Sequence, residues 1–197
     1  MKHKLPLAIL FIVFSVGVNA QKIKFVSGSF APLKGVSEVN LKFTYDNLMV
    51  GKITEDEYLA KKIKDYNEKE PGKGDKFKEG WDTDREKRYH PKFEKLINEY
   101  TGTTKFGDYP EAKYTMVVQV IRIEPGWNIG ISKRAASLDC DIKILDESEN
   151  EIMVATVRNA PGSQFGGYDY DVGSRVAECY AITGKRMGGF FKKQTKK

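Results

Sequence analysis

The chain has 197 residues, with 33 Lys and Arg against 27 Asp and Glu, so its formal net charge is +6. This length suffices for one domain with a substantial hydrophobic core, but not for two large ones. Hydrophobic residues make up 40% of the chain, which excludes a wholly disordered protein. The two cysteines are too few for a disulfide scaffold or a four-cysteine zinc site.

Residues 1–20 have the pattern of a secretory signal peptide. Lys2 and Lys4 form a basic start, and an apolar run follows from Leu5 to Val18. This run is too short for a comfortable membrane span, so we expect cleavage after Ala20 and a periplasmic or secreted mature chain. An uncleaved anchor or a buried core helix is the alternative. No later stretch is long and apolar enough to predict a transmembrane segment.

The positive charge is concentrated at the two ends of the chain. Loss of residues 1–20 leaves 31 basic against 27 acidic residues, or +4, and residues 21–184 carry 25 against 27, or −2. This distribution argues against a nucleic-acid partner, which needs a basic face on the folded domain. We expect residues 192–197 to form a solvated basic tail. The alternative is weak contact with an anionic surface through Lys192, Lys193, Lys196 and Lys197.

The first half of the mature chain shows two strands and two helices. Alternating apolar residues predict strands over 22–26 and 38–45. A Thr-x-x-Glu capping box begins a helix predicted over 54–68. The segment 70–80 is polar and rich in Gly and Lys, which predicts a mobile surface loop. A proline at the first position and Gly102 after the last predict a helix over 91–101.

The second half predicts a sheet closed by a final helix. The near-continuous apolar segment 114–123 is typical of a central strand. Strands over 136–145 and 151–157 are expected to form a hairpin, and a last helix follows a glycine-rich stretch near residue 172. We therefore predict a single α+β domain over residues 21–191. It has a mixed or mainly antiparallel sheet of about five strands, with three helices mainly on one face.

The two cysteines are expected in the same layer of the fold. Cys140 lies on the inward face of a predicted strand, and Cys179 lies on the apolar side of the last predicted helix. In an oxidising compartment a disulfide between them is one interpretation, and two buried inert thiols are the other. A catalytic cysteine is not expected, because its one available partner, His90, lies in no orienting motif.

Residue patterns that indicate catalysis or metal binding are missing from the sequence. The mature chain has one histidine, His90, and no HExxH, CxxC or calcium-loop motif, so we expect no metal and no cofactor. We interpret His90 as a helix cap or a maker of one local hydrogen bond. Asp169 and Asp171 resemble a glycosidase carboxylate pair, but also suit the entry to a helix. A non-enzymatic protein is expected, and a hydrolase acting on an envelope polymer or glycan is the alternative.

Two loops are predicted to meet at one end of the sheet. Segment 125–134 precedes the first hairpin strand and segment 158–171 follows the second, so both emerge at the same end. Their aromatic and polar side chains suit stacking on sugar rings or holding an extended partner chain. The candidate binding residues are Trp127, Asn128, Lys133, Arg134, Gln164, Phe165, Tyr168 and Tyr170. The alternative is that Trp127 and Phe165 fold back as a small core beneath the loops.

The second half of the chain resembles small periplasmic α/β domains. The segment PKFEKLINEY is followed by KYTMVVQVIRI, by SLDCDIKILDESENEIMVATV and by a helix ending in GKRMGGFF. This helix–strand–hairpin–helix order over residues 91–191 is similar to the N-terminal domain of the Tol translocation protein and to curli-assembly-type lipoproteins. The whole chain also resembles exported Gram-negative proteins of unknown function. The resemblance implies a non-enzymatic, protein-binding role in the envelope and supplies no site residues. The lipid-attachment cysteine is missing, and the first 70 mature residues are not covered.

Overall fold

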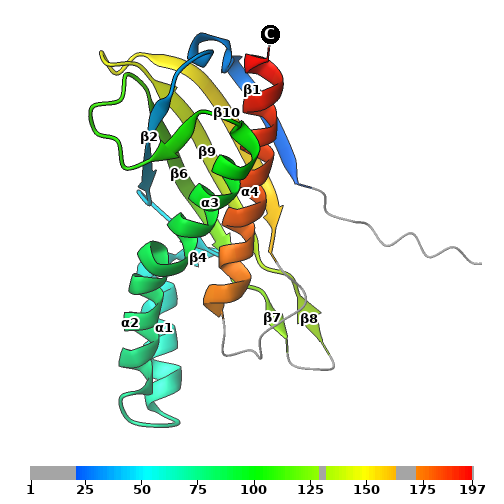
Figure 1. Ribbon diagram of the computed structural model, residues 1–197. Coiled ribbons are helices and arrows are strands. Elements are labelled where there is room, and N and C mark those ends of the chain that lie inside the picture. Colours follow the sequence, from blue (N-terminus) through cyan, green and yellow to red (C-terminus); the bar gives the residue numbers. More distant parts are fainter. Residues whose placement is uncertain (1–20, 129–131, 163–171, 197) are drawn as a thin grey trace, which may run out of the picture.

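The computed structural model describes residues 21–128, 132–162 and 172–196. In this part of the chain the strands form an eight-stranded mixed sheet and a separate two-stranded arm (Figure 1). Six strands cross the sheet in the order β1 (Lys22–Gly28), β10 (Glu151–Pro161), β9 (Ser137–Leu145), β6 (Thr115–Glu124), β2 (Glu38–Thr44) and β5 (Lys105–Gly107). The short strand β3 (Met49–Val50) pairs with β6 and with β4 (Ile53–Thr54).

The sheet is mixed, as predicted, but the expected number of about five strands is wrong. Strands β1, β10, β9 and β6 are antiparallel neighbours, whereas β2 is parallel to β6 and β5 is parallel to β2. The unpredicted β3, β4 and β5 contain only two or three residues each. Such short strands give no alternating pattern, because alternation needs several residues to be recognised.

The helices form three continuous bodies in the described residues. The first is α1 (Glu55–Asn67), and the last is α4 (Val172–Thr195). Between them, α2 (Lys73–Asp84), a π-helical segment (Arg85–Tyr89) and α3 (His90–Thr101) follow one another without a break. A short 3-10 turn (Ala31–Leu33) precedes β2. Helices α3 and α4 lie against one face of the sheet, and α1 and α2 form a hairpin that projects beyond it (Figure 1).

The predicted loop over residues 70–80 is wrong, because helix α2 begins at Lys73. Gly72 makes the tight turn with a positive φ of 80°, and the Asn67 side chain accepts a hydrogen bond from the Gly74 N–H at 2.7 Å. A Cβ atom on Gly74 would lie 2.3 Å from the Ile63 carbonyl oxygen, so this glycine lets α2 approach α1 closely. The glycines of residues 70–80 predict a loop, but in the structure Gly72 makes the turn and Gly74 permits the close contact between α1 and α2.

The helix predicted to begin at Pro91 continues instead from α2 through the π-helical segment. The His90 N–H donates to the Arg85 carbonyl, five residues back. A proline inside an α-helix meets the carbonyl four residues before it and lacks a donor of its own. The wider π turn just before Pro91 relieves that contact, which explains how the helix passes through the proline.

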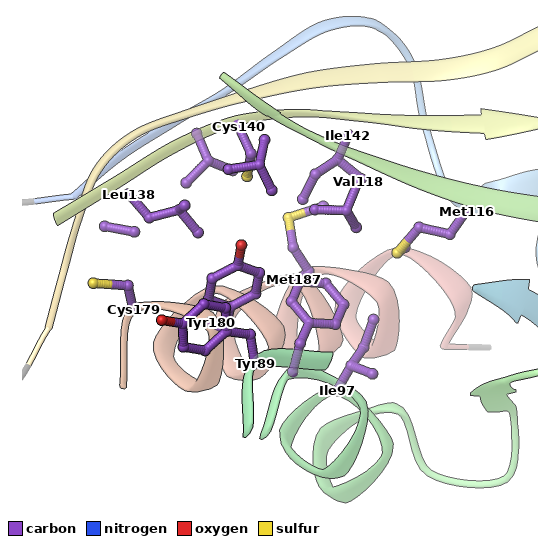
Figure 2. Close-up of a cluster of buried hydrophobic side chains, with 14 of the residues drawn as sticks. Tyr89, Ile97, Met116, Val118, Leu138, Cys140, Ile142, Cys179, Tyr180 and Met187 are labelled. Atoms are coloured by element: carbon purple, nitrogen blue, oxygen red, sulfur yellow. The ribbon is translucent and has the colours of Figure 1, made fainter. Parts of the chain in front are cut away.

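The hydrophobic core lies between the sheet and helices α3 and α4. Figure 2 shows Tyr180 and Met187 of α4 lying opposite Val118, Cys140 and Ile142 of the sheet. On the other face, Arg122 and Arg158 form ion pairs with Asp139 and Asp141, respectively. These two aspartates of β9 therefore lie on the side opposite Cys140, and the sheet has one apolar and one polar face.

Within the described ranges, strand β1 forms one edge of the sheet and pairs with β10 alone. Lys22 lies opposite Arg158, and the register shifts between Phe25 and Ser27. Val26, at this bulge, is 57% exposed. Bulges and lysines on an edge strand discourage pairing with another chain.

The predicted basic tail over residues 192–197 is wrong for most of its length, because helix α4 continues to Thr195. Phe191 is buried, and the side-chain oxygen of Gln194 accepts a hydrogen bond from the Phe30 N–H at 2.7 Å. The last turns of α4 therefore pack on the segment after β1 and belong to the domain.

Helices α3 and α4 come into backbone contact through two glycines. A Cβ atom on Gly184 would lie 2.4 Å from the Phe93 carbonyl oxygen, and one on Gly188 would lie 2.6 Å from the Ile97 carbonyl oxygen. Both distances are shorter than real Cβ contacts. The spacing of four residues places these glycines on one face of α4, directed at α3.

Substitution of Gly184 tests this contact. We expect Gly184→Ala to lower the free energy of unfolding by about 1–3 kcal/mol, because the added methyl group forces two backbones apart. Gly189→Ala is the matched control, since a Cβ there meets nothing within 4 Å. The control is expected to be neutral or to stabilise the helix by up to about 1 kcal/mol. Urea unfolding followed by circular dichroism measures both, and equal effects would contradict the close contact.

Candidate functional site

The segment 125–134, predicted as a loop, contains a two-stranded arm. Strand β7 (Trp127–Asn128) pairs antiparallel with β8 (Lys133–Arg134). The arm follows β6 and leads into β9, and it projects beyond the end of the main sheet (Figure 1). Four of the predicted binding residues therefore lie on one short hairpin, namely Trp127, Asn128, Lys133 and Arg134.

Close contacts fix the base of the arm to α4 and to the end of β10. Gly126 has a positive φ of 66°, and a Cβ there would lie 2.3 Å from the Arg134 carbonyl oxygen. Arg175 of α4 is 3% exposed, and its Nε donates to the Pro125 carbonyl at 3.2 Å. The Gly162 N–H donates to the Ala136 carbonyl at 2.8 Å, so β10 ends beside the same base. Helix α4 and β10 together hold the arm in place.

Trp127 is exposed on this rigid base. Its side chain is 37% exposed, its Nε1 donates to the Ser132 hydroxyl at 3.2 Å, and the Arg134 guanidinium lies 5.4 Å from its ring centroid. Arg134 also pairs with Glu124 at 3.4 Å. Trp127 is thus positioned by neighbours but is not part of the buried core. An indole held open beside a cation suits stacking on a flat apolar face that also carries acceptors.

The remaining predicted site residues lie outside the described part of the chain. These are Gln164, Phe165, Tyr168 and Tyr170, together with the carboxylate pair Asp169 and Asp171. The chain leaves β10 at Gly162, next to the base of the arm, and re-enters the described structure at Val172 of α4. The prediction that these residues share a surface with Trp127 stays a prediction.

A polar cluster at the π-helical segment was missed by the sequence analysis. The Tyr45 hydroxyl lies 2.9 Å from His90 Nε2 and 3.2 Å from the Tyr180 hydroxyl. The Arg85 guanidinium stacks on the Tyr45 ring at 3.9 Å and donates to the Glu55 carboxylate. Glu55 also accepts from the Trp81 indole. The cluster therefore joins the residue after β2 to α1, α2, the π-helical segment, α3 and α4 at one point.

His90 is neither a helix cap nor engaged in a merely local hydrogen bond, so that interpretation is wrong. Its ring stacks on Phe43 with centroids 4.0 Å apart and an interplanar angle of 5°. Burial, assisted by the nearby positive charge of Arg85, lowers the pKa of His90 to about 4. Burial likewise raises the pKa of Tyr45 to about 12. Both groups are neutral near neutral pH, which favours a structural joint over acid–base chemistry.

A shallow cleft of about 380 Å³ lies between α3 and the first turns of α4. Its cationic lining residues are Lys87, Arg88, Lys92 and Lys95. Arg88 pairs with Asp84 at 3.0 Å, and Lys92 pairs with Glu178 at 3.2 Å. Because carboxylates already pair with Arg88, Lys92 and, at 3.9 Å, Lys95, the cleft is a weaker candidate for ligand binding than the arm.

Both cysteines are free and fully buried in the structure. Of the two interpretations of Cys140 and Cys179, the structure therefore has the unbridged one. Burial raises the pKa of each thiol. A buried thiol that stays protonated is a poor nucleophile, so neither cysteine is placed for catalysis.

The described residues contain no group of three or more His, Cys, Asp or Glu side chains arranged to hold a metal ion. None of the helices in the described ranges combines the length and apolar character that crossing a membrane requires.

Comparisons with known proteins assign no family. No protein-family model matches the chain, and no curated protein matches it. Among solved structures, the PelC dodecamer from Paraburkholderia phytofirmans is similar, with 12% identity and a TM-score of 0.41 over 83% of this chain and 96% of that one. A Xanthomonas campestris protein from a family of unknown function has 13% identity and a TM-score of 0.33 over 50% of this chain and 57% of that one. Both TM-scores are too low to support an argument about function.

The lowered pKa of His90 predicts how acid affects stability. Between pH about 6.5 and about 4 the unfolded chain binds a proton at this residue and the folded chain does not, so stability falls as the pH drops through that window. When the pH is lowered from neutral to the pKa of about 4, we expect the melting temperature of His90→Gln to fall less than that of the wild type. Thermal melts at matched ionic strength measure the difference. An identical pH profile for the two proteins would show that His90 titrates normally.

Proposed function

We propose that the mature chain is a periplasmic or secreted, non-enzymatic binding protein of the bacterial envelope, which contacts a protein or a glycan through the β7–β8 arm. The observation that carries this proposal is the half-exposed indole of Trp127 on an arm anchored to α4 by Arg175. A large aromatic side chain that stays open on a rigid support offers contact area at little cost in conformational entropy.

The charge around Trp127 supports a ligand with acceptor groups. The Arg134 guanidinium lies over the indole ring. Lys133 is the neighbouring residue on the hairpin, where it lies opposite Asn128 of β7. Glu124 holds Arg134 in position through an ion pair. A sugar ring or an aromatic side chain would stack on the indole, while hydroxyl or carboxylate oxygens would accept from the guanidinium.

Export is tested by fractionating cells that produce the full chain. We expect the wild type in the periplasm or the medium, with a mass that corresponds to loss of residues 1–20. Replacing two apolar residues of the predicted signal, Ile9→Arg with Ile12→Arg, should leave an unprocessed chain inside the cell, because charges prevent the segment from entering the membrane. Equal export of both chains would contradict a cleaved signal peptide.

Binding is tested by co-sedimentation of the exported protein with washed envelope fragments. We expect Trp127→Ala to weaken binding by about tenfold or more, the effect of losing a central aromatic contact. Val26→Ala is the matched control, since Val26 is also an exposed hydrophobic residue but lies on edge strand β1. It should bind as the wild type does.

Two treatments of the fragments separate the partner classes. Protease digestion should abolish binding if the partner is a protein, and periodate oxidation should abolish it if the partner is a glycan. Equal binding by Trp127→Ala and the wild type, or no sedimentation of the wild type with untreated fragments, would sink the proposal.

A further inference from the structure

Gln21 occupies an unusual place for a glutamine. It directly precedes β1, its side chain is only 6% exposed, and it lines a cleft of about 430 Å³ between the start of β1 and the last turns of α4. Its main-chain carbonyl oxygen accepts a hydrogen bond from the Arg186 guanidinium of α4 at 3.4 Å. Residue 21 is therefore part of the packed domain.

The side-chain amide of Gln21 is buried without a partner. Both Nε2 and Oε1 lie out of contact with solvent and make no hydrogen bond. An unsatisfied buried amide costs free energy, so native proteins rarely retain one. This particular orphaned group needs a physical explanation.

Signal cleavage after Ala20 would place a second problem at the same point. The new α-amino group of Gln21 would carry a positive charge beside a cleft whose described lining includes Arg186 and Lys193 and no acidic residue. Burying a charge next to like charges is unfavourable. An open N-terminal glutamine would thus combine an orphaned amide with an uncompensated ammonium.

We propose that Gln21 is a modification site, at which the mature chain closes into an N-terminal pyroglutamyl ring. The unprotonated α-amino nitrogen attacks Cδ of the Gln21 side chain, forming the lactam C–N bond. The Cδ–Nε2 bond breaks, and the side-chain nitrogen leaves as ammonia with the proton given up by the amine. No oxidant or reductant takes part.

The ring removes the orphaned donor and the positive charge, and Oε1 remains as the lactam carbonyl. The orphaned Nε2 leaves the cleft, and the charged amine becomes a neutral lactam N–H. The small ring keeps its carbonyl and its apolar carbons against Ile23 and Phe190, which also line the cleft. This inference rests on the proposed export, because only cleavage after Ala20 frees the amine of Gln21.

The test is the intact mass of the exported product of the full chain, measured before any digestion. We expect a chain that begins at residue 21, is lighter than the open form by one ammonia, and resists Edman degradation. Gln21→Glu is the matched control, because an ionised carboxylate is a far poorer electrophile than an amide, so this product should keep an open N-terminus.

Burial of the ring gives a second readout. Pyroglutamyl aminopeptidase should release the first residue from the proteolytic peptide that ends at Glu38 but not from the folded protein. A product with an open Gln21 amine overturns the modification and leaves export intact. A product that retains residues 1–20 overturns both. Release from the folded protein as fast as from the peptide overturns the buried ring.

Discussion

The close approach of helices α3 and α4 is the constraint on which the rest of the structure depends. Gly184 and Gly188 bring the α4 backbone against the carbonyls of Phe93 and Ile97. This approach sets the height of the helix layer over the sheet and therefore the space that the core side chains fill. It also fixes the direction of α4, whose first turns hold the arm through Arg175 and whose last turns reach Phe30.

The same helix links regions of opposite character. Next to the π-helical segment, Tyr45, His90 and Tyr180 satisfy one another in a part-buried cluster, and a satisfied polar network of this kind adds specificity to the fold. At the arm, Trp127 remains open to solvent although its neighbours fix its position. Among the aromatic side chains of the described residues, Trp127 is the exposed one, and the proposed binding role depends on it.

The sequence predicted those elements whose own residues determine them. The capping box at Thr54 formed as expected, and β2, β6, β9 and β10 followed their apolar alternation. The failures concern partners that are distant in the chain. Gly74 suits a helix only because Ile63 passes next to it, and the helix end at Thr195 depends on packing of Phe191. For the site, position 127 was predictable as an aromatic between strands, whereas its support by Arg175, 48 residues later, was not.

The pairing of β1 with β10 has a consequence for when the domain can form. The first strand of the described chain has no other neighbour in the sheet, and Lys22 pairs with Arg158. Strand β1 therefore cannot pair until the last strand has been made, and the apolar face of the sheet stays uncovered until α4 has been made. Folds that depend on such distant pairings form slowly. The complete sheet can therefore form only after β10, the element before the last helix, has left the ribosome.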